Sequence, residues 1–282
     1  MDVARAITGR TRLFAVLGDP VVQVQAPRLM NALFADLGHD AVLVPVQVSP
    51  AHLDTVVHGL RATGNVDGLL ITVPHKVAVC RVADEWSTTV QLTGCANALR
   101  RQPDGRWLAE NFDGAGFVSA LAASGVTVTG RQVALVGVGG AGSAIAVALL
   151  QDGVRRLTVC DRDDERLRSF LARAATRWPG QVTGTTEPDL RGVDIAVNAT
   201  PLGLRPGDPL PFDPHLVPRG ATVADIIMEP AETALLRQAR ALGHRTQPGL
   251  PMLRHQLEHY RRFFGLDRVT ARSTSPEPRS TL

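Results

Sequence analysis

The sequence predicts an α/β protein of two domains, an N-terminal α/β domain followed by a Rossmann-type, doubly wound dinucleotide-binding domain. Two observations carry this prediction. Apolar strands and amphipathic helices alternate along most of the chain, which favours parallel sheets covered by helices. A glycine-rich segment at residues 137–142 lies between an apolar strand and an apolar helix, which is the setting of a dinucleotide-binding turn. The length of 282 residues is sufficient for two separate cores.

The first domain is expected from the alternation at the start of the chain. Residues 12–18 are an apolar run ending in glycine, which predicts a buried strand, and Pro27 is placed to open the next helix. Pro-Asp-Gly at residues 103–105 predicts a hairpin, and helix 115–124 leads into the second domain. The elements predicted between these landmarks are helix 28–37, strand 41–48, helix 51–63, strand 67–73 and helix 77–93.

The second domain is expected to open with strand 132–136, which has no polar face, and the glycines are followed by helix 143–151. The polar segment 271–282 contains two prolines and no core positions, so we expect it to be disordered. The other predicted elements are strands 157–160, 194–200 and 222–228, the proline-rich loop 201–219, and helices 233–242 and 254–264.

Lys76 is the one lysine of the chain, because every other residue counted as Lys or Arg is arginine. A lysine amine can give up its proton in suitable surroundings, whereas arginine stays protonated. The apolar segment 69–73 leads to Pro74, which removes a ladder donor and ends the strand. Lys76 would then follow the carboxyl end of a strand, where open α/β sheets bind their ligands. The alternative is a solvated surface lysine.

The glycine-rich segment has the spacing of a dinucleotide-binding turn in its proper strand–turn–helix setting. Its glycines let the backbone approach a pyrophosphate at the N-terminus of the following helix. The residues expected to bind the cofactor here are Gly137, Gly139, Gly140, Ala141 and Gly142.

Asp161 ends the next predicted strand about 20 residues after the glycines, where an acidic residue accepts from the adenosine ribose. A carboxylate there repels a 2′-phosphate, which favours NAD. Arg162 follows at once and could stack on adenine or receive a phosphate, so NADP stays open. The two residues could also be only the solvated start of a helix cap. Asn198 and Thr200 end a later strand, near the expected nicotinamide.

Composition argues against several classes of protein. No apolar run approaches the ~20 residues of a membrane helix, and the N-terminus lacks the apolar core of a signal peptide. The three cysteines, Cys80, Cys95 and Cys160, fit neither a disulfide framework nor a zinc site, so we expect a cytoplasmic protein without a metal. A net charge of +3 and 4% aromatic residues argue against a nucleic-acid partner.

Taken together, these segments resemble the shikimate dehydrogenase family, including its quinate/shikimate branch, over nearly the whole chain except the tail. Each motif alone is weak, but they occur in the family's order and at sensible spacing. The matching segments are Thr72 to Lys76, Gly94 to Leu99, Asn111 to Phe117, the glycine turn, Asn198 to Thr200, and Gly249 to Gln256.

The resemblance implies a dehydrogenase with a substrate domain at residues 1–113, completed by residues 246–270, and a nicotinamide-binding domain at residues 114–245. It implies Lys76 and Asp113 as the catalytic pair. Oxidation of a secondary alcohol needs a base for the hydroxyl proton as hydride leaves, and a lysine beside an aspartate would titrate with it as a unit. The expected partner is a small cyclic hydroxy acid or polyol, bound by a monomer or homodimer.

The same resemblance assigns further contacts. Asn97 and Gln256 would hold ring hydroxyls and Thr72 would contact the substrate, while Ile226 and Gly249 would contact the cofactor. The residues themselves allow plainer alternatives: Asp113 could be only a helix N-cap, and Asn97 only a turn former.

The chain departs from the family at the end of the site that holds the substrate carboxylate. The family usually has two serines there, and this chain has Val24 and Ala26. A tyrosine that helps at the same end is replaced by Met228, and the single tyrosine, Tyr260, lies in the last predicted helix. A hydrogen bond to a charged group contributes ~1.5–3 kcal/mol. Because these hydrogen bonds to the carboxylate are missing, we predict weak binding of shikimate itself.

Two explanations of this departure compete. The substrate is a related polyol without that carboxylate, which we favour, or Gln23 and Gln25 supply amide donors from a shifted position. Two other functions also remain open, a dehydrogenase of methylenetetrahydrofolate type and a non-catalytic nucleotide sensor. The matches at Asn111, Asp113 and Gln256 argue against the first, and the single lysine argues against the second.

Overall fold

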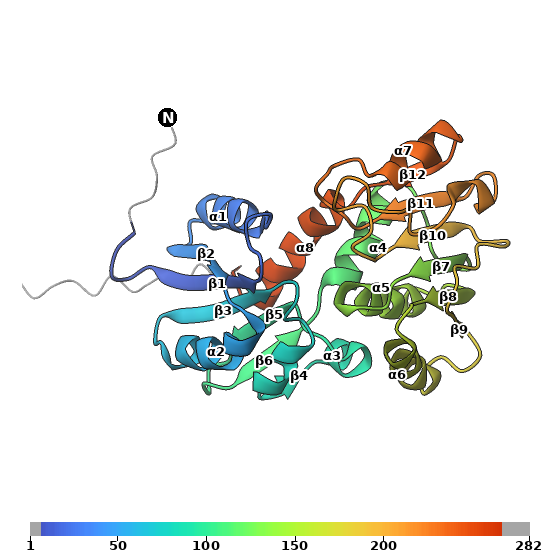
Figure 1. Ribbon diagram of the computed structural model, residues 1–282. Helices are drawn as coiled ribbons and strands as arrows, with labels where there is room; N and C mark the ends of the chain where they lie inside the picture. Colours follow the sequence, from blue (N-terminus) through green and yellow to red (C-terminus); the bar gives the residue numbers. More distant parts are fainter. Residues whose placement is uncertain (1–6, 267–282) are drawn as a thin grey trace, which may run out of the picture.

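The computed structural model describes residues 7–266, so the segment 271–282, predicted to be disordered, lies outside the described residues. The chain forms two lobes, each built around one sheet (Figure 1). Helices α4 (Asp113–Ala123) and α8 (Leu250–Phe263) lie between the lobes. No helix within residues 7–266 is both long and apolar enough to cross a membrane.

The first lobe contains the strands and helices predicted from the alternating pattern, with one exception described below. Its elements are β1 (Arg12–Gly18), α1 (Ala26–Asp36), β2 (Ala41–Gln47), the 3-10 turn η1 (Pro50–His52), α2 (Leu53–Ala62), β3 (Val66–Ile71), the 3-10 turn η2 (Ala78–Val82), β4 (Glu85–Trp86), α3 (Thr88–Thr93), β5 (Ala98–Arg101) and β6 (Trp107–Glu110). The sheet order is β2-β1-β3-β5-β6-β4. β1 is parallel to β2 and β3, whereas β5 is antiparallel to β3 and β6.

The single helix predicted over residues 77–93 is wrong. The structure forms η2, then β4, then the short helix α3. The backbone N–H of Asp84 donates to Trp107 O at 2.9 Å, and β4 pairs with β6. This pairing requires an extended segment in the middle of the range, so tertiary contacts override local helix propensity. Ser87 then starts a new helix, because its hydroxyl accepts from the N–H of Val90.

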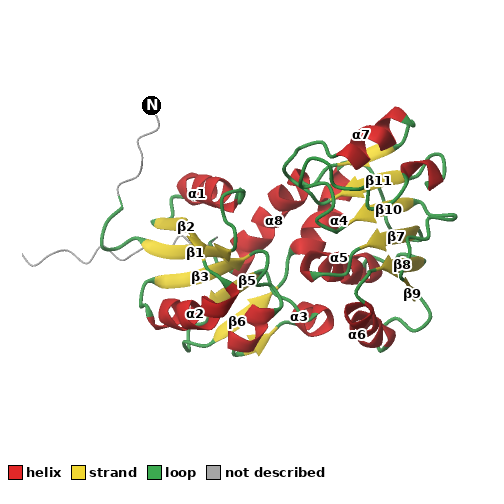
Figure 2. Cartoon of the chain, in the orientation of Figure 1, coloured by secondary structure: helices red, strands yellow, loops and turns green. Residues whose placement is uncertain are grey.

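The second lobe is a fully parallel sheet. Its elements are β7 (Gln132–Val136), α5 (Gly140–Gln151), β8 (Arg156–Cys160), α6 (Asp164–Ala175), β9 (Val182–Thr185), β10 (Ile195–Asn198), the 3-10 turn η3 (Pro214–Leu216), β11 (Thr222–Asp225), α7 (Ala234–Ala241) and β12 (Arg245–Gln247). The order is β12-β11-β10-β7-β8-β9, with every neighbouring pair parallel. Figure 2 shows these strands side by side with helices around them. The order reverses between β7 and β10, where doubly wound sheets bind ligands.

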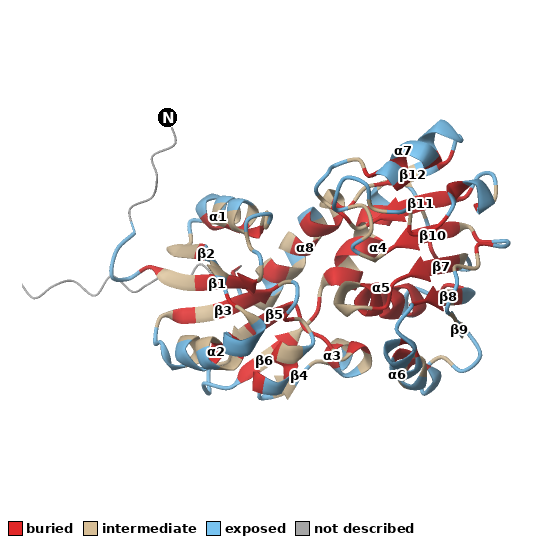
Figure 3. Ribbon diagram, in the orientation of Figure 1, coloured by how far each residue is buried: buried red, intermediate tan, exposed pale blue. Residues whose placement is uncertain are grey.

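Helix α8 joins the two lobes through its buried face. Met252, near its start, packs in the core of the second lobe, and Tyr260, near its end, packs in the core of the first. In Figure 3 the buried parts of α4, α5 and α8 face one another between the two sheets. Glycines in α4 permit this approach, since a Cβ on Gly114 would lie 2.1 Å from Ala144 O. The predicted return of the C-terminal helix to the first domain is confirmed by this packing.

Candidate active site

Lys76 is held in a turn that follows β3. On one side the buried ring of His75 lies 2.7 Å from Val48 O through Nε2. On the other, the N–H of Ala96 donates to Lys76 O at 2.8 Å. The Lys76 ammonium donates to Asp113 Oδ2 at 2.5 Å, and the two side chains are only 14% and 5% exposed. Lys76 is therefore not a solvated surface lysine.

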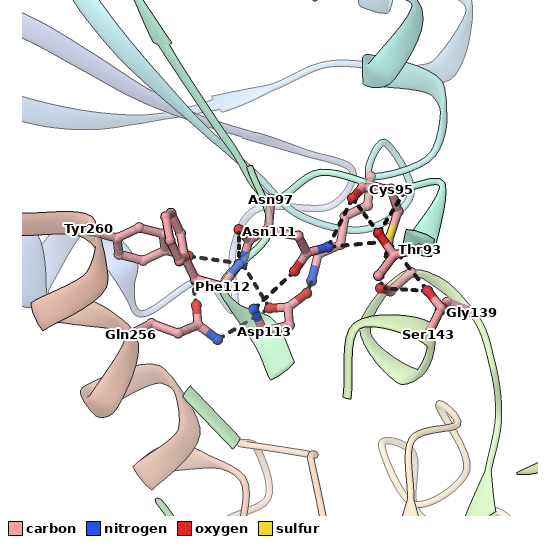
Figure 4. A network of polar contacts seen from close by, with 12 residues as sticks. Thr93, Cys95, Asn97, Asn111, Phe112, Asp113, Gly139, Ser143, Gln256 and Tyr260 are labelled. Carbon is pink, nitrogen blue, oxygen red and sulfur yellow. Dashed lines mark hydrogen bonds and ion pairs between the residues drawn. The ribbon is translucent and has the colours of Figure 1, made fainter. Parts of the chain in front are cut away.

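Asp113 is the first residue of α4 and uses both carboxylate oxygens (Figure 4). While Oδ2 contacts Lys76, Oδ1 accepts from Asn97 Nδ2 at 3.0 Å and from Gln256 Nε2 at 3.2 Å. The residue at the cap position of α4 is Phe112, and its side chain makes no capping hydrogen bond. Asp113 is thus aimed at the lysine rather than used as a helix cap.

Asn97 also has a role beyond the turn before β5. Its Oδ1 accepts from the N–H of Phe112 at 2.9 Å, and its Nδ2 donates to the Tyr260 hydroxyl at 3.2 Å as well as to Asp113. The side chain is 2% exposed. Four segments of the chain therefore meet here: the turn after β3, the turn before β5, the start of α4, and α8.

Tyr260 is a member of this network that the sequence analysis did not assign to the site. Its hydroxyl donates to Gln256 Oε1 at 2.6 Å. Burial, and then the negative charge of Asp113, raise the pKa of Tyr260 well above its usual value, so the phenol is neutral and can donate. The spacing of four residues from Gln256 places both on one face of α8, and this was the available sequence signal.

The glycine turn of the second lobe lies against the lysine. A Cβ on Gly140 would lie 3.1 Å from Lys76 Cβ and 3.2 Å from its Cδ, so the lysine stem packs on this glycine. The buried thiol of Cys95 lies 2.9 Å from Gly140 O and 3.4 Å from the Ser143 hydroxyl. The proposed catalytic pair and the predicted cofactor turn therefore adjoin one another.

A cavity of about 890 Å³ opens at the carboxyl ends of β7, β8 and β10. Of the residues predicted to bind the cofactor, the following line it: Gly137, Gly139, Asp161, Arg162 and Thr200. Gly140 instead faces Lys76, and Ala141 and Gly142 lie within α5. Gly142 is needed for close packing, since a Cβ there would lie 2.0 Å from Gly137 O. The turn matches the expected cradle for a pyrophosphate at the start of α5.

Asp161 lines this cavity, but its carboxylate already has several donors. The N–H groups of Val138 and Asp163 donate to it at 2.9 and 3.0 Å. Arg166, which the sequence analysis did not single out, approaches both oxygens at 3.3 and 3.4 Å. Arg162 is exposed and lines the cavity together with Arg166. Asp161 therefore connects the glycine turn to the end of β8 by a hydrogen bond. Arg162 and Arg166 lie at the same end of the cavity as Asp161.

Asn198 supports the cavity rather than lining it. Its side chain is buried, donates to Asp225 Oδ1 and Leu202 O at 3.1 Å, and accepts from the hydroxyl of Thr200 at 2.7 Å. These bonds leave Asn198 to fix the loop that carries Thr200. Gly249 packs against the backbone of Ile226, since a Cβ on the glycine would lie 2.3 Å from Ile226 O.

The residues predicted around the substrate are placed as follows. Thr72 packs against Gly18 at the end of β1, because a Cβ added to Gly18 would lie 2.5 Å from Thr72 Cγ2. Gln23 is exposed and donates to Pro20 O at 3.1 Å, and Gln25 makes no capping hydrogen bond to α1. Met228 is partly buried after β11.

No group of three or more histidine, cysteine or acidic side chains within residues 7–266 is arranged to hold a metal ion. The three cysteines predicted to stay unpaired are free and buried.

Comparisons with known proteins identify relatives over most of the chain. A family model described as the shikimate dehydrogenase substrate binding domain matches residues 16–99. A protein of Rubrobacter xylanophilus named shikimate dehydrogenase (NADP(+)) is 40% identical over 275 residues, which is 95% of each chain. One of the same name from Symbiobacterium thermophilum is 37% identical and covers 88% of this chain and 87% of its own.

Solved structures share the fold over most of the chain. The ligand-free 5-ketofructose reductase of Gluconobacter sp. strain CHM43 superposes with a TM-score of 0.80 at 28% identity, covering 91% of this chain and 94% of its own. Shikimate dehydrogenase from Aquifex aeolicus gives 0.83 at 28%, covering 92% and 95%. Quinate dehydrogenase from Corynebacterium glutamicum in complex with NAD gives 0.79 at 30%, covering 91% and 95%.

Proposed function

Because the chain belongs to the shikimate dehydrogenase family, we propose that it is an oxidoreductase transferring a hydride between a nicotinamide cofactor and a secondary alcohol of a shikimate- or quinate-like cyclic polyol. The observation that carries the proposal is the 2.5 Å contact between Lys76 Nζ and Asp113 Oδ2. Both side chains are largely buried, and the lysine stem packs on the glycine turn.

The arrangement supplies what alcohol oxidation requires of the protein. The nicotinamide, when bound, supplies the hydride acceptor. Lys76 and Asp113 act as a unit to receive and return the hydroxyl proton, since their charges are coupled across one short contact. Asn97 and Gln256 each donate to Asp113 Oδ1, which fixes the carboxylate relative to the lysine. The burial of the pair strengthens these electrostatic interactions relative to water.

The fit of the glycine turn supports a dinucleotide as cofactor. Gly139 lines the cavity, and a Cβ on it would meet no protein atom within 4 Å, so the space in front of it is open. The open space in front of Gly139 leaves room for a pyrophosphate to approach the backbone at the start of α5.

We propose NADP rather than NAD as the preferred cofactor, although the acidic Asp161 first favoured NAD. The Asp161 carboxylate already accepts from Val138, Asp163 and Arg166, which leaves little capacity for ribose hydroxyls. Arg162 and Arg166 border the cavity at the same end, and arginine suits a phosphate. The names of the two curated relatives described above, which specify NADP(+), support the same choice.

The test of function is a dehydrogenase screen of cyclic hydroxy acids and polyols with NAD and NADP side by side. The reverse direction is screened with neutral ketones such as 5-ketofructose. We expect reversible hydride transfer with at least one polyol. Tight cofactor binding without turnover on any of these compounds would instead support the nucleotide-sensor alternative.

The cofactor choice has its own test. Arg162→Ala and Arg166→Ala are expected to lower kcat/KM for NADP by about tenfold or more, because each removes a charge-assisted contact to phosphate. The NAD value should change little. Arg168→Ala is the matched control, since Arg168 lies on α6 with Arg166 but contacts Asp164 O and does not line the cavity. Equal losses with both cofactors would contradict the choice of NADP.

A further inference from the structure

The short helix α3 of the first lobe packs on helices of the second lobe. Figure 1 shows α3 beside α5 and α6, and α3 contacts both of them. Leu92, in the last turn of α3, is partly buried and packs against the hydrophobic core of the second lobe. Helix α3 therefore forms a junction between the lobes in addition to the one that α8 provides.

Arg173 of α6 binds the C-terminal end of α3. Its Nε donates to Leu92 O at 2.9 Å, and its Nη2 donates to Thr93 O at 3.2 Å. The last turn of a helix leaves carbonyl oxygens without helical partners and carries partial negative charge, so a guanidinium is well suited to it. Nη1 donates to Ser169 Oγ at 2.6 Å within α6, which orients the arginine toward α3. We call these two interlobe hydrogen bonds of Arg173 the α3–α6 contact.

The segment that follows α3 leads from this contact to the active site. The Thr93 hydroxyl donates to Cys95 O at 3.1 Å and so fixes the turn at the end of the helix. The Cys95 thiol lies 2.9 Å from Gly140 O, at the start of α5 in the other lobe. The N–H of Ala96 donates to Lys76 O at 2.8 Å. A few residues therefore connect the α3–α6 contact with both the catalytic lysine and the glycine turn.

We propose that Arg173 is a positioning residue for hydride transfer, which holds the segment 94–97 against the start of α5 and thereby keeps Lys76 beside the glycine turn. The proposal rests on the proposed function, because this placement affects turnover only if Lys76 and the cofactor take part in one reaction. Arg173 is absent from the walls of the cofactor cavity that the described residues form. It acts through the segment that it holds.

Labelling of Cys95 by a thiol reagent tests the α3–α6 contact without an activity assay. Cys95 is 0% exposed and lies against Gly140 and Ser143, so a reagent reaches it when this junction opens or the protein unfolds. Arg173→Ala removes two hydrogen bonds from a charged donor, so we expect Cys95 to be labelled at least about tenfold faster than in wild type. Cys80, in the core of the first lobe, is the internal control and should keep its rate.

Mass spectrometry of the labelled peptides separates the two thiols. An unchanged rate at Cys95 would overturn the proposal. Equal acceleration at Cys80 and Cys95 would also overturn it, because global unfolding exposes both thiols, and Arg173 would then serve overall stability.

Steady-state kinetics with NADP and the best polyol from the screen tests the effect on catalysis. In Arg173→Ala we expect kcat to fall at least about tenfold, because Lys76 is misplaced relative to the glycine turn. The Kd for NADP should change little, since the residues that line the cavity are intact. Arg173→Lys can still donate to a carbonyl oxygen of α3 and should recover part of kcat. Arg168→Ala, an exposed change on the same helix, is the control and should leave kcat and Cys95 labelling unchanged.

The outcomes distinguish this proposal from the proposed function. If the wild type is active and Arg173→Ala keeps its kcat, the positioning role is overturned and the proposed function stands. If the wild type oxidises no polyol, the proposed function is overturned, and the positioning role with it, whatever the labelling rates.

Discussion

Removal of one hydroxyl, in Tyr260→Phe, tests whether the network around Asp113 depends on α8. The variant loses the bond to Gln256 Oε1 at 2.6 Å and the bond from Asn97 Nδ2 at 3.2 Å. The Gln256 side chain is 2% exposed, so its carbonyl oxygen would be left buried without this donor. A buried polar group left unsatisfied costs about 1–3 kcal/mol, and the ring itself can stay in place. We therefore expect a loss of unfolding free energy in this range.

The assay is denaturant unfolding followed by circular dichroism, with kcat/KM measured on the same preparations. We expect kcat/KM to fall together with stability, because Asn97 and Gln256 also orient Asp113. Thr63→Val is the control, since it removes an exposed hydroxyl that bonds only to Gly59 O within its own helix end. A Tyr260→Phe protein within about 0.5 kcal/mol of wild type, with unchanged kcat/KM, would refute the reasoning.

Three further predictions concern other parts of the molecule. Gly139→Ala should keep the wild-type Tm yet weaken NADP binding in titration calorimetry, because the added methyl meets no protein atom and enters the cavity. Burial raises the pKa of Cys80 to about 12 and also raises the pKa values of Cys95 and Cys160, so a thiol reagent at pH 8 should label three cysteines only after unfolding. Arg261 lowers the pKa of Glu258 to about 2, so the Tm advantage over Glu258→Gln should shrink as pH falls below 4.5.

One result would contradict each of the predictions for Gly139, the cysteines and Glu258. An unstable Gly139→Ala protein would indicate that the glycine serves the fold instead of the ligand. Rapid labelling of any cysteine in the native protein would contradict its burial. The sign for Glu258 follows from its lowered pKa: the ionised form is favoured by folding, so its contribution is present above the unfolded value and is lost at lower pH. A Tm difference independent of pH would contradict that ion pair.

Strands that are buried over most of their length could be predicted from sequence, because an unbroken apolar run is itself a signal for a buried strand. β1 and β7 are of this kind, and their predicted bounds match the structure. β9 and β12 were not predicted, since they are short, polar in part and exposed at the sheet edges. The helix predicted over residues 77–93 was wrong because its middle pairs with β6, a contact that no local pattern reveals.

In the site, too, residues within local motifs could be predicted, whereas roles that depend on tertiary packing could not. Lys76 and Asp113 could be predicted because their neighbours form motifs, and the structure brings them together. Tyr260 was missed: its spacing of four residues from Gln256 places it on the same face of α8, but the sequence does not show that this face packs beside Asn97, 163 residues away. The position of Asp161 was predicted, but its saturation by backbone donors depends on how the glycine turn folds over β8.

The central claim is that Lys76, held against Asp113, handles the proton of the reacting alcohol, and Lys76→Met tests it most directly. The neighbouring Val77→Met is the matched control, because Val77 is 62% exposed and receives the same new side chain. With the best polyol from the screen, Lys76→Met should lose at least about a hundredfold in kcat while binding NADP normally, and Val77→Met should retain its activity. Wild-type kcat in Lys76→Met would contradict the account.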